Sequence, residues 1–406
     1  MSTDLLPLEG ITVVALEQAV AAPLATRHLA DLGARVIKLE RVGEGDFARN
    51  YDHAVRGLAS HFVWLNRGKE SVALDLKSAE GADIARRLVA EADVFLQNAA
   101  PGAAERLGLG ADELAARHPR LVIAGISGYG THGPLSDRKA YDMLIQAESG
   151  LISVTGTPET ATKTGVPSAD IAAGLYTAQA VVAALLRRER TGSGGVVDIS
   201  MFDATVEWLG HPMYMQMYGG RQIPRMGLSH ASIAPYDAYP TSDGEILIGV
   251  QNDRGWRALV AEVFERPDLA EHPRLATNPL RVRHRQECDA VVAELTRRFT
   301  TAELDTRLAA AGVPAAQVND MAGLVDHAQL AARDRWREVA TPAGPVRAVL
   351  PPMTFRDVEL KMGDIPELGA HTDGVLGELG IDLDTRDRLA VSGVVGRPAA
   401  GPDPTS

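Results

Sequence analysis

The chain of 406 residues has few of the side chains that build disulfides, thiolate metal sites or aromatic surfaces. Cys288 is the only cysteine, so the chain can form neither an internal disulfide nor a zinc site made of thiolates. Aromatic residues make up 5% of the chain, and only six of its 41 basic residues are lysines. A pocket for an anion therefore has to rely mainly on arginine and a few individual lysines.

Several nucleotide and metal signatures are also missing. The turn after the first expected strand reads EQAVAAPLA, without the GxGxxG that lets a backbone approach a pyrophosphate. LNRGKES lacks the first glycine of a P-loop, GISGYG lacks the second glycine of a nucleophile elbow, and neither HExxH nor an EF-hand loop occurs. These absences argue against NAD and metal chemistry, so we expect no metal and no tightly bound cofactor.

Charge and hydropathy limit the partners of the chain. The formal net charge of -12 argues against non-specific binding to nucleic acid or to anionic membranes. No uncharged apolar segment reaches the roughly 20 residues that a membrane helix needs, and the start MSTDLLPLEG lacks a signal-peptide pattern. We therefore expect a cytoplasmic protein that binds neither nucleic acid nor membranes.

Short apolar runs alternate with helical patterns over the first 130 residues. The expected strands are Ile11–Leu16, Ala34–Leu39, Val72–Leu76, Val94–Leu96 and Leu121–Ile126. Because parallel strands need helical crossovers, this alternation predicts a doubly wound, Rossmann-like α/β domain.

The character of the sequence changes after residue 210. A stretch rich in Met and Tyr leads to an α+β pattern with a hairpin signal, Thr-Ser-Asp-Gly, at 241–244. Val346–Leu350 and Met353–Leu360 are expected to return as strands. The predicted organisation is a large domain over 1–210 that resumes at 330–390, a smaller α+β domain over 211–329 and a disordered tail over 391–406.

One carboxylate, Asp170 in PSADIAAGLYTAQ, stands before an apolar helical pattern. As an N-cap it would accept a hydrogen bond from an early helix N–H group. As a nucleophile it would be kept ionised by the helix N-terminus, whose spare N–H groups would stabilise an oxyanion. Gly174, one turn further on, costs up to about 1 kcal/mol in a helix and is expected to leave room for a bulky group beside the carboxylate. The residues alone leave both interpretations open.

The run GVPSADIAAGLYTAQAVVAALLRRERTGSGGVVDISMFDA at 165–204 resembles the family III CoA-transferases, which include formyl-CoA:oxalate and carnitine CoA-transferases. Other matching stretches, in the same order and spacing, cover most of the chain, among them LEGITVVALEQAVAAPLATRHLADLGARVIKLERVGEGD, LNRGKESVALDLKSAEG and LGAHTDGVLGELG. The resemblance implies interlocked homodimers, in which each chain has a large Rossmann-like domain built from both ends and a smaller domain between them.

The resemblance also implies a reaction. Asp170 would attack an acyl-CoA thioester, form an aspartyl-CoA intermediate and pass CoA to a free carboxylic acid, with no ATP or metal. Positions that match the family's CoA contacts are Ala19, Val20, Ala21, Arg41, Leu74, Lys77, Asn98, Arg106 and Lys139. Coenzyme A thus enters as a substrate and not as a bound cofactor.

Three further residues are candidates for the acyl site: Tyr141, Gln146 and His230. The α-methylacyl-CoA racemases share the fold that the resemblance implies, but they carry a histidine where this chain has Tyr141. Because a phenol with a pKa near 10 is a poor base at neutral pH, Tyr141 favours transfer over racemisation. The alternatives are such a racemase, or an acyl-CoA-binding protein without activity in which Asp170 only caps its helix.

Overall fold

The computed structural model describes residues 5–398, which divide into two compact units. Unit 1 contains the chain up to residue 151, residues 164–210 and the chain from residue 333 onward. Unit 2 contains residues 152–163 and 211–332. The short segment 152–163, which the sequence analysis assigns to the large domain, thus belongs with the smaller unit.

Unit 1 is built on a seven-stranded sheet with the order β12-β3-β2-β1-β4-β5-β6. All neighbouring pairs are parallel except β12 with β3. This order is that of dinucleotide-binding Rossmann folds, so the predicted fold class is confirmed. The strands are β1 (Thr12–Leu16), β2 (Arg35–Glu40), β3 (Lys69–Leu74), β4 (Val94–Gln97), β5 (Val122–Ser127), β6 (Gly195–Ser200) and β12 (Val395–Gly396).

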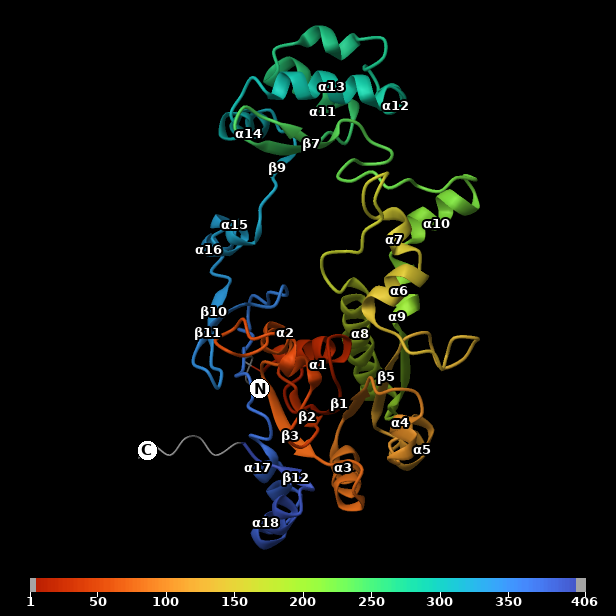
Figure 1. Cartoon of the computed structure of the whole chain (residues 1–406), viewed down its shortest axis with the longest axis vertical. Helices are drawn as coiled ribbons and strands as arrows, with labels where there is room; N and C mark the ends of the chain where they lie inside the picture. Colours follow the sequence, from red (N-terminus) through yellow and green to blue (C-terminus); the bar gives the residue numbers. More distant parts are fainter. Residues whose placement is uncertain (1–4, 399–406) are drawn as a thin grey trace. The chain divides into compact units, whose positions relative to one another are not determined.

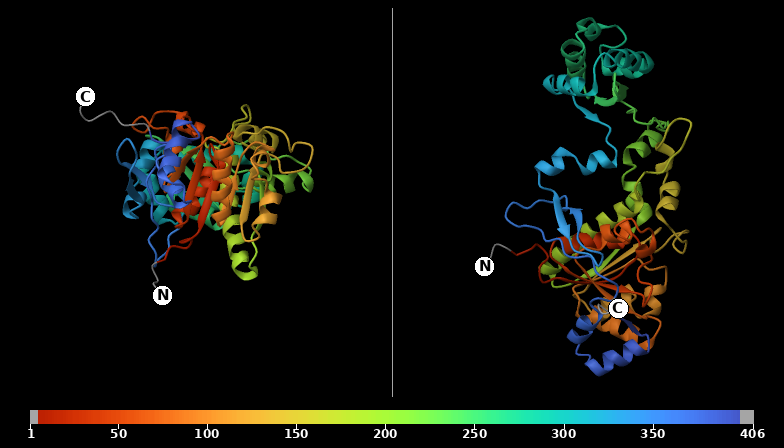
Figure 2. Two further views of the ribbon diagram at one scale, coloured as in Figure 1. Left: turned by 90° about the horizontal axis from the view of Figure 1, so that it is seen from below. Right: turned by 60° about the vertical axis from the view of Figure 1, so that its left-hand side comes forward.

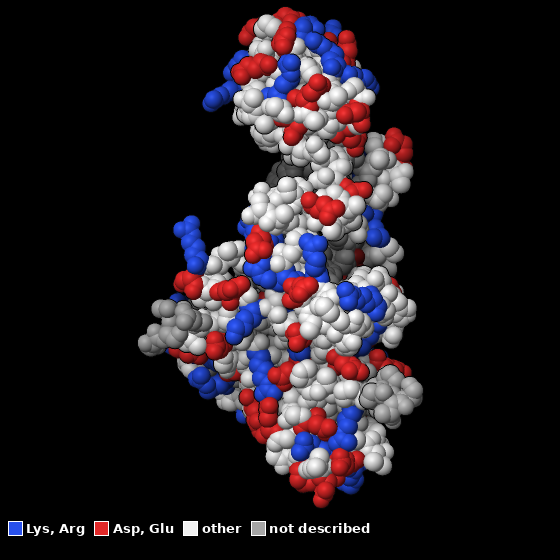
Figure 3. Space-filling view, turned by 90° about the vertical axis from the view of Figure 1, so that its left-hand side faces the viewer, with Lys and Arg blue, Asp and Glu red and all other residues white. Residues whose placement is uncertain are grey.

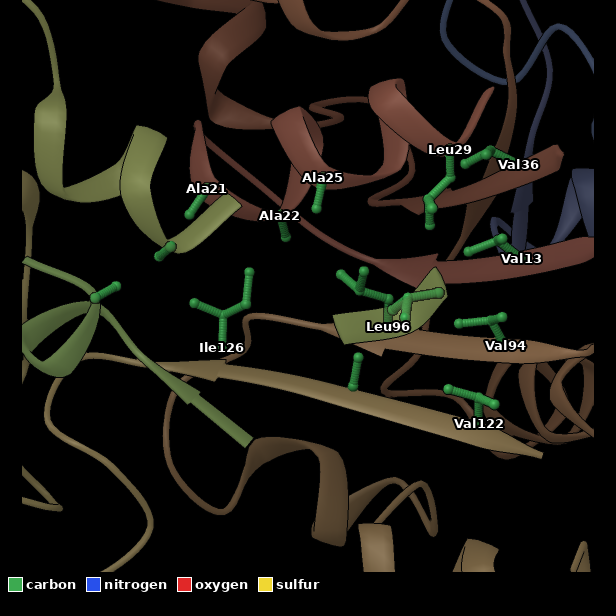
Figure 4. Packing of buried hydrophobic residues seen from close by; sticks show 14 of the residues in the cluster. Val13, Ala21, Ala22, Ala25, Leu29, Val36, Val94, Leu96, Val122 and Ile126 are labelled. Carbon is green, nitrogen blue, oxygen red and sulfur yellow. The ribbon is translucent and has the colours of Figure 1, made fainter. Parts of the chain in front are cut away.

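Helices cover both faces of this sheet (Figure 1, Figure 2). Successive strand residues point to opposite faces, so each strand feeds two separate cores. Val13 and Leu96 pack with α1 and α8 on one face, whereas Val14 and Phe95 pack with α3 and α17 on the other. Figure 4 shows the first core, where small residues of α1 lie over β1, β4 and β5.

The helices of unit 1 are mostly short, apart from α8. They are α1 (Ala21–Asp31), α2 (Ser60–Leu65), α3 (Ala79–Glu91), α4 (Ala103–Arg106), α5 (Ala111–Arg117), α6 (Asp142–Glu148), α8 (Ser168–Thr191), α9 (Met201–Glu207), α17 (Thr372–Glu378) and α18 (Leu383–Val391), with the 3-10 helix η1 (Phe47–Asn50). Two more, α7 (Leu151–Val154) and α10 (Gly210–Met217), lie where the chain passes between the units.

The C-terminal part of unit 1 differs from the prediction in two places. Residues 391–398, assigned to a disordered tail, finish α18 and form β12, which pairs antiparallel with the end of β3. The rest of that tail, 399–406, lies outside the described residues. Residues 353–360, expected to form a strand, contain none; β11 (Val346–Val349) pairs instead with β10 (Trp336–Val339).

Unit 2 has a three-stranded antiparallel sheet of β7 (Tyr236–Pro240), β8 (Glu245–Gly249) and β9 (Ala315–Gln317). The predicted hairpin at 241–244 joins β7 to β8. Helices pack on this sheet around Trp256 and Phe264, both almost fully buried. They are α11 (Asp253–Ala258), α12 (Asn278–Arg283), α13 (Arg285–Thr296) and α14 (Thr301–Ala310), with η2 (Leu259–Val263) and η3 (Pro267–Glu271); α15 (Met321–Val325) and α16 (Ala328–Ala332) follow β9.

Helix α8 is long and apolar enough to span a membrane, with a mean hydropathy of 1.5 in its most apolar window. It instead packs along α1, and its residues Ala169, Ala172, Ala173 and Thr177 are buried in unit 1. On the face drawn in Figure 3, acidic and basic side chains are interspersed, without a large area of one sign.

Candidate active site

The turn after β1 lies where the strand order of the sheet reverses. β1 is flanked by β2 on one side and by β4 on the other, and ligands of such sheets bind at the carboxyl ends of these strands. Gln18 joins the loops there: its N–H donates to Asn98 Oδ1 at 3.0 Å, and its carbonyl accepts from Asn98 Nδ2 at 2.9 Å. Arg41, after β2, donates to Gln18 Oε1 at 3.3 Å. The predicted residues Asn98 and Arg41 thus meet at Gln18, which the sequence analysis did not select.

The next residues turn the chain into α1. Ala19 has a φ of 65°, in the left-handed region, and its N–H donates to Asp46 Oδ1 at 3.1 Å. Val20 precedes the helix and Ala21 begins it, both with buried side chains. Among the described residues, nothing accepts a hydrogen bond from the N–H groups of Ala21 and Ala22. Two unpaired amides therefore stand at the start of α1.

Asp170 is the third residue of α8 and does not cap it. The residue before the helix is Pro167, and the helix amides of Ala169 and Asp170 donate to Asp142 Oδ1 at 2.8 and 3.3 Å. The cap is thus supplied by a side chain from the start of α6. Within the described part of the chain, the Asp170 carboxyl makes no hydrogen bond. The interpretation of Asp170 as the N-cap is therefore wrong.

Gln146 holds this cap in place. Its Nε2 donates to Asp142 Oδ2 at 2.7 Å, and its Oε1 accepts from the N–H of Thr164 at 2.9 Å. The side chain is fully buried, with 0% of its surface exposed. Gln146, predicted as a substrate contact, therefore orients Asp142 and anchors the segment that leads into α8.

Asp170 is half-buried, and its electrostatic surroundings differ from the expected ones. Burial, followed by the negative charge of Asp142, raises the pKa of the Asp170 carboxyl to about 7. The helix N-terminus was expected to hold this group ionised, but the amides that would do so donate elsewhere. Ala169 and Asp170 donate to Asp142, and Ile171 donates to the carbonyl of Pro167. The first turn of α8 thus has no spare amide there for an oxyanion.

Gly174 also has a different role from the predicted one. A Cβ atom at this position would lie 2.6 Å from the carbonyl oxygen of Ala21 and 3.1 Å from Leu24 Cβ. The missing side chain therefore lets α1 approach α8 and leaves no room for a ligand. Its consequence for the site is indirect: the start of α1, with its two unpaired amides, is held one helical turn from Asp170.

The other predicted CoA contacts fall into two groups. Arg41, Lys77, Arg106 and Lys139 have exposed side chains, and that of Arg41 also donates to Gln18. Leu74 ends β3 with 1% of its surface exposed, pairs with Val395 and belongs to the core, so its side chain is not available to a ligand.

Aromatic residues lie near Asp170 in unit 1. Tyr141, the residue before α6, is 67% exposed and is not a core aromatic. Burial, and then the charges of Asp46 and Asp170, raise the pKa of Tyr51 to about 12. The phenol of Tyr51 is therefore close enough to Asp170 for the two groups to interact electrostatically. The sequence analysis had no motif that would select Tyr51.

His230 belongs to unit 2. Its ring stacks on Tyr236 with 5.4 Å between the centroids, and its Nδ1 accepts from the N–H of Ser232 at 3.1 Å. Burial and the nearby His211 and Arg285 lower the pKa of His230.

The fold and this site are those of an α/β enzyme with a free carboxyl at a strand-order switch. The profile of CoA-transferase family III matches residues 8–372. An acyl-CoA transferase of Fusarium pseudograminearum is 35% identical over 96% of this chain and 88% of its own length. Human succinyl-CoA:glutarate CoA-transferase is 34% identical over 92% of this chain and 86% of its own length.

A solved structure agrees with these matches. A CAIB/BAIF family protein from Brucella suis superposes with a TM-score of 0.81 and 36% identity, covering 92% of this chain and 99% of the other. The chain therefore belongs to CoA-transferase family III, and the resemblance found in its sequence is confirmed.

Proposed function

We propose that the enzyme moves CoA from an acyl-CoA donor to a free carboxylic acid through a covalent aspartyl-CoA intermediate on Asp170. The observation that carries this proposal is that Asp142, and not Asp170, caps the start of α8. Asp142 takes the capping amides, so the Asp170 carboxyl is left without a structural partner, half-buried and beside the switch point of the sheet. A carboxylate in that position is available as a nucleophile.

Each step exchanges one acyl bond for another. A carboxylate oxygen of Asp170 attacks the thioester carbonyl, and the C–S bond breaks to give a mixed anhydride and CoA thiolate. The thiolate attacks the aspartyl carbonyl and releases the donor acid, which leaves an aspartyl-CoA thioester. The acceptor carboxylate then attacks this thioester, and the returning thiolate takes the acceptor acyl group and frees Asp170.

The tetrahedral intermediates carry a negative oxygen that needs hydrogen-bond donors. The unpaired amides of Ala21 and Ala22 are suitable, since helix N-termini favour negative charge and buried donors stabilise oxyanions strongly. Gly174 supports this assignment because it brings the carbonyl of Ala21 against α8, one turn from Asp170.

CoA itself would extend over the carboxyl ends of the strands. We assign the turn of Ala19, Val20 and Ala21 to its pantetheine end, and Asn98 to the shaping of that turn. The exposed side chains of Arg41, Lys77, Arg106 and Lys139, together with the backbone of Leu74, would meet the ADP part. Tyr141, exposed beside α6, and His230 remain candidates for the acyl group.

The substrates are best sought among dicarboxylates, since the human relative is named a succinyl-CoA:glutarate CoA-transferase. Succinyl-CoA with glutarate is therefore the first pair to assay. We also propose that the chain acts in the cytoplasm as an interlocked homodimer. The molar mass from light scattering at assay concentration would test whether the chain is a dimer.

The decisive experiment is trapping of the intermediate. Wild-type protein incubated with acyl-CoA and then treated with borohydride or hydroxylamine should carry a mass change on the peptide that contains Asp170. Asp170→Ala should lose the adduct and at least about 1,000-fold of CoA exchange, because it removes the nucleophile. Asp112→Ala, a matched change in the first turn of α5 at an exposed position, should do neither. Near-normal exchange by Asp170→Ala would refute the proposal, and rapid α-proton exchange without an acceptor acid would favour a racemase.

A further inference from the structure

A cluster of four buried charges lies next to the β1–α1 turn. We call Glu17, Lys38, Asp46 and Lys69 the buried ion cluster; each has at most 4% of its surface exposed. Lys69 Nζ lies 2.7 Å from Glu17 Oε1, and Lys38 Nζ lies 3.3 Å from the same oxygen and 2.8 Å from Asp46 Oδ2. The two ammonium groups and two carboxylates thus form one connected chain of charge-assisted hydrogen bonds.

Such a cluster is a costly way to fill a core. Buried ion pairs often contribute no more stability than apolar residues of similar size, because each charge loses its hydration. Burial lowers the pKa of Lys69 to about 7, which illustrates that cost. What such pairs do supply is a fixed geometry for the groups that they hold.

One carboxylate oxygen of the cluster, Oδ1 of Asp46, bonds to the β1–α1 turn. Asp46 Oδ2 is held by Lys38, while Oδ1 accepts from the N–H of Ala19 at 3.1 Å and from the N–H of Ala48 at 2.9 Å. Ala19 needs this support, because the Cβ atom of a residue other than glycine disfavours the left-handed conformation. A glycine would adopt it without that cost.

The conformation of Ala19 decides where the chain enters α1. Two residues later come the unpaired amides of Ala21 and Ala22, and Ala19 packs in the same small apolar cluster as Ile171, the neighbour of Asp170. A change at Ala19 would therefore move those amides relative to the nucleophile.

We infer that Asp46, braced by Lys38 in the buried ion cluster, is a positioning residue that keeps Ala19 left-handed and so fixes the start of α1 beside Asp170. This inference rests on the proposed function of Asp170. Asp46 itself is buried and bonds to the backbone of the turn, so it would act on the site through Ala19.

Two substitutions of Asp46 separate positioning from stability. Asp46→Asn and Asp46→Ala both remove the charge that pairs with Lys38, but only asparagine keeps an oxygen that can accept from the N–H of Ala19. Asp31→Asn is the matched control, because it breaks another buried ion pair of α1, with Arg67 at 2.7 Å, at the far end of the helix.

The main readout is the single-turnover rate of adduct formation on Asp170. We expect a loss of at least tenfold for Asp46→Ala, recovery to within about threefold of wild type for Asp46→Asn, and an unchanged rate for Asp31→Asn despite its lower Tm. Equal rates for the two Asp46 variants would overturn the inference. If Asp46→Ala does not fold, Asp46→Ser, whose oxygen sits one atom closer to the backbone, takes its place in the comparison.

A second readout does not depend on catalysis. Hydrogen exchange at the Ala19 amide should be slow in wild type and in Asp46→Asn but faster in Asp46→Ala, measured against the Asp31→Asn protein. Unchanged protection in Asp46→Ala would contradict the inference even if the enzyme is active. If wild type forms no adduct with any acyl-CoA, the proposed function fails, and the exchange data alone decide whether Asp46 anchors the turn.

Discussion

Gly174 sets the distance between α8 and α1, and the substitution Gly174→Ala tests this packing directly. The added Cβ would lie 2.6 Å from the carbonyl oxygen of Ala21 and 3.1 Å from both Cβ and Cδ2 of Leu24. Since non-bonded heavy atoms settle at about 3.5 Å, the helices would have to separate by roughly 0.5–1 Å. The nearest atom belongs to the backbone, so no side-chain rotation can relieve the contact.

Two opposing effects decide the change in stability. Alanine in place of glycine favours a helix by up to about 1 kcal/mol. Overpacking of a closely packed interior costs typically about 1–3 kcal/mol. Because the contact is with a carbonyl group of a helix that is itself buried, we expect the cost to exceed the gain and the variant to lose about 1–2 kcal/mol.

Urea unfolding followed by tryptophan fluorescence measures this loss, and Gly374→Ala is the control. Gly374 also lies in a helix, α17, but a Cβ there would meet no atom within 4 Å, so that variant should be as stable as wild type or slightly more stable. Gly174→Ala should also slow adduct formation on Asp170, because it displaces the start of α1. A Gly174→Ala protein as stable as Gly374→Ala would show that the close approach of the two helices is not what the glycine provides.

Two further predictions concern the carboxyl pair. Because the pKa of Asp170 is raised to about 7, the rate of adduct formation under kcat/KM conditions should increase with pH through about 7. Asp142→Asn removes the neighbouring negative charge, so the midpoint of this pH dependence should move to lower pH. An unmoved midpoint would contradict the coupling of the two carboxyl groups. Because the pKa of Asp170 is 3.8 in the unfolded chain and about 7 in the folded one, the wild type loses stability as the pH rises from 4 to 7. Asp170→Asn lacks this loss, so its Tm advantage over wild type should grow between pH 4 and 7 and stay constant outside that range. A constant Tm difference between pH 4 and 7 would argue against the raised pKa.

Much of the large domain could be predicted from local patterns. Apolar runs of three to six residues such as Val94–Leu96 mark strands, and the helical repeats between them imply parallel crossovers, so the sheet follows. The return of the chain at Val395 could not be predicted in this way. β12 contains two residues, and it is held by pairing with Leu74, more than 300 positions earlier, which leaves no local signal. The strand expected at 353–360 does not form. The apolar alternation there is a local strand signal, but the segment pairs with no other strand of the described residues.

The site was predictable where the chemistry is local and wrong where it depends on contacts between distant segments. Arg41 and Asn98 were selected from the family resemblance, and they lie close together because each follows a strand and the carboxyl ends of parallel strands meet at one edge. Gly174 was assigned to ligand space, because its sequence position says nothing about the carbonyl of Ala21 that fills that space. Gln18 and Tyr51 carried no motif, and only the folded chain brings them to this edge.

Asp170 illustrates why a helix start is ambiguous in sequence and clear in structure. An aspartate there satisfies the rules for a cap and for a nucleophile alike, and both rules draw on the same amide groups. Those amides can serve one carboxylate fully, and Asp142, 28 residues earlier and oriented by Gln146, has them. The occupied amides fix α8 in position, and the charge that occupies them raises the pKa of Asp170. In the proposed mechanism, a carboxyl that is neither hydrogen-bonded nor fully solvated is more reactive once ionised, so the same contact that stabilises the helix would also leave Asp170 available as the nucleophile.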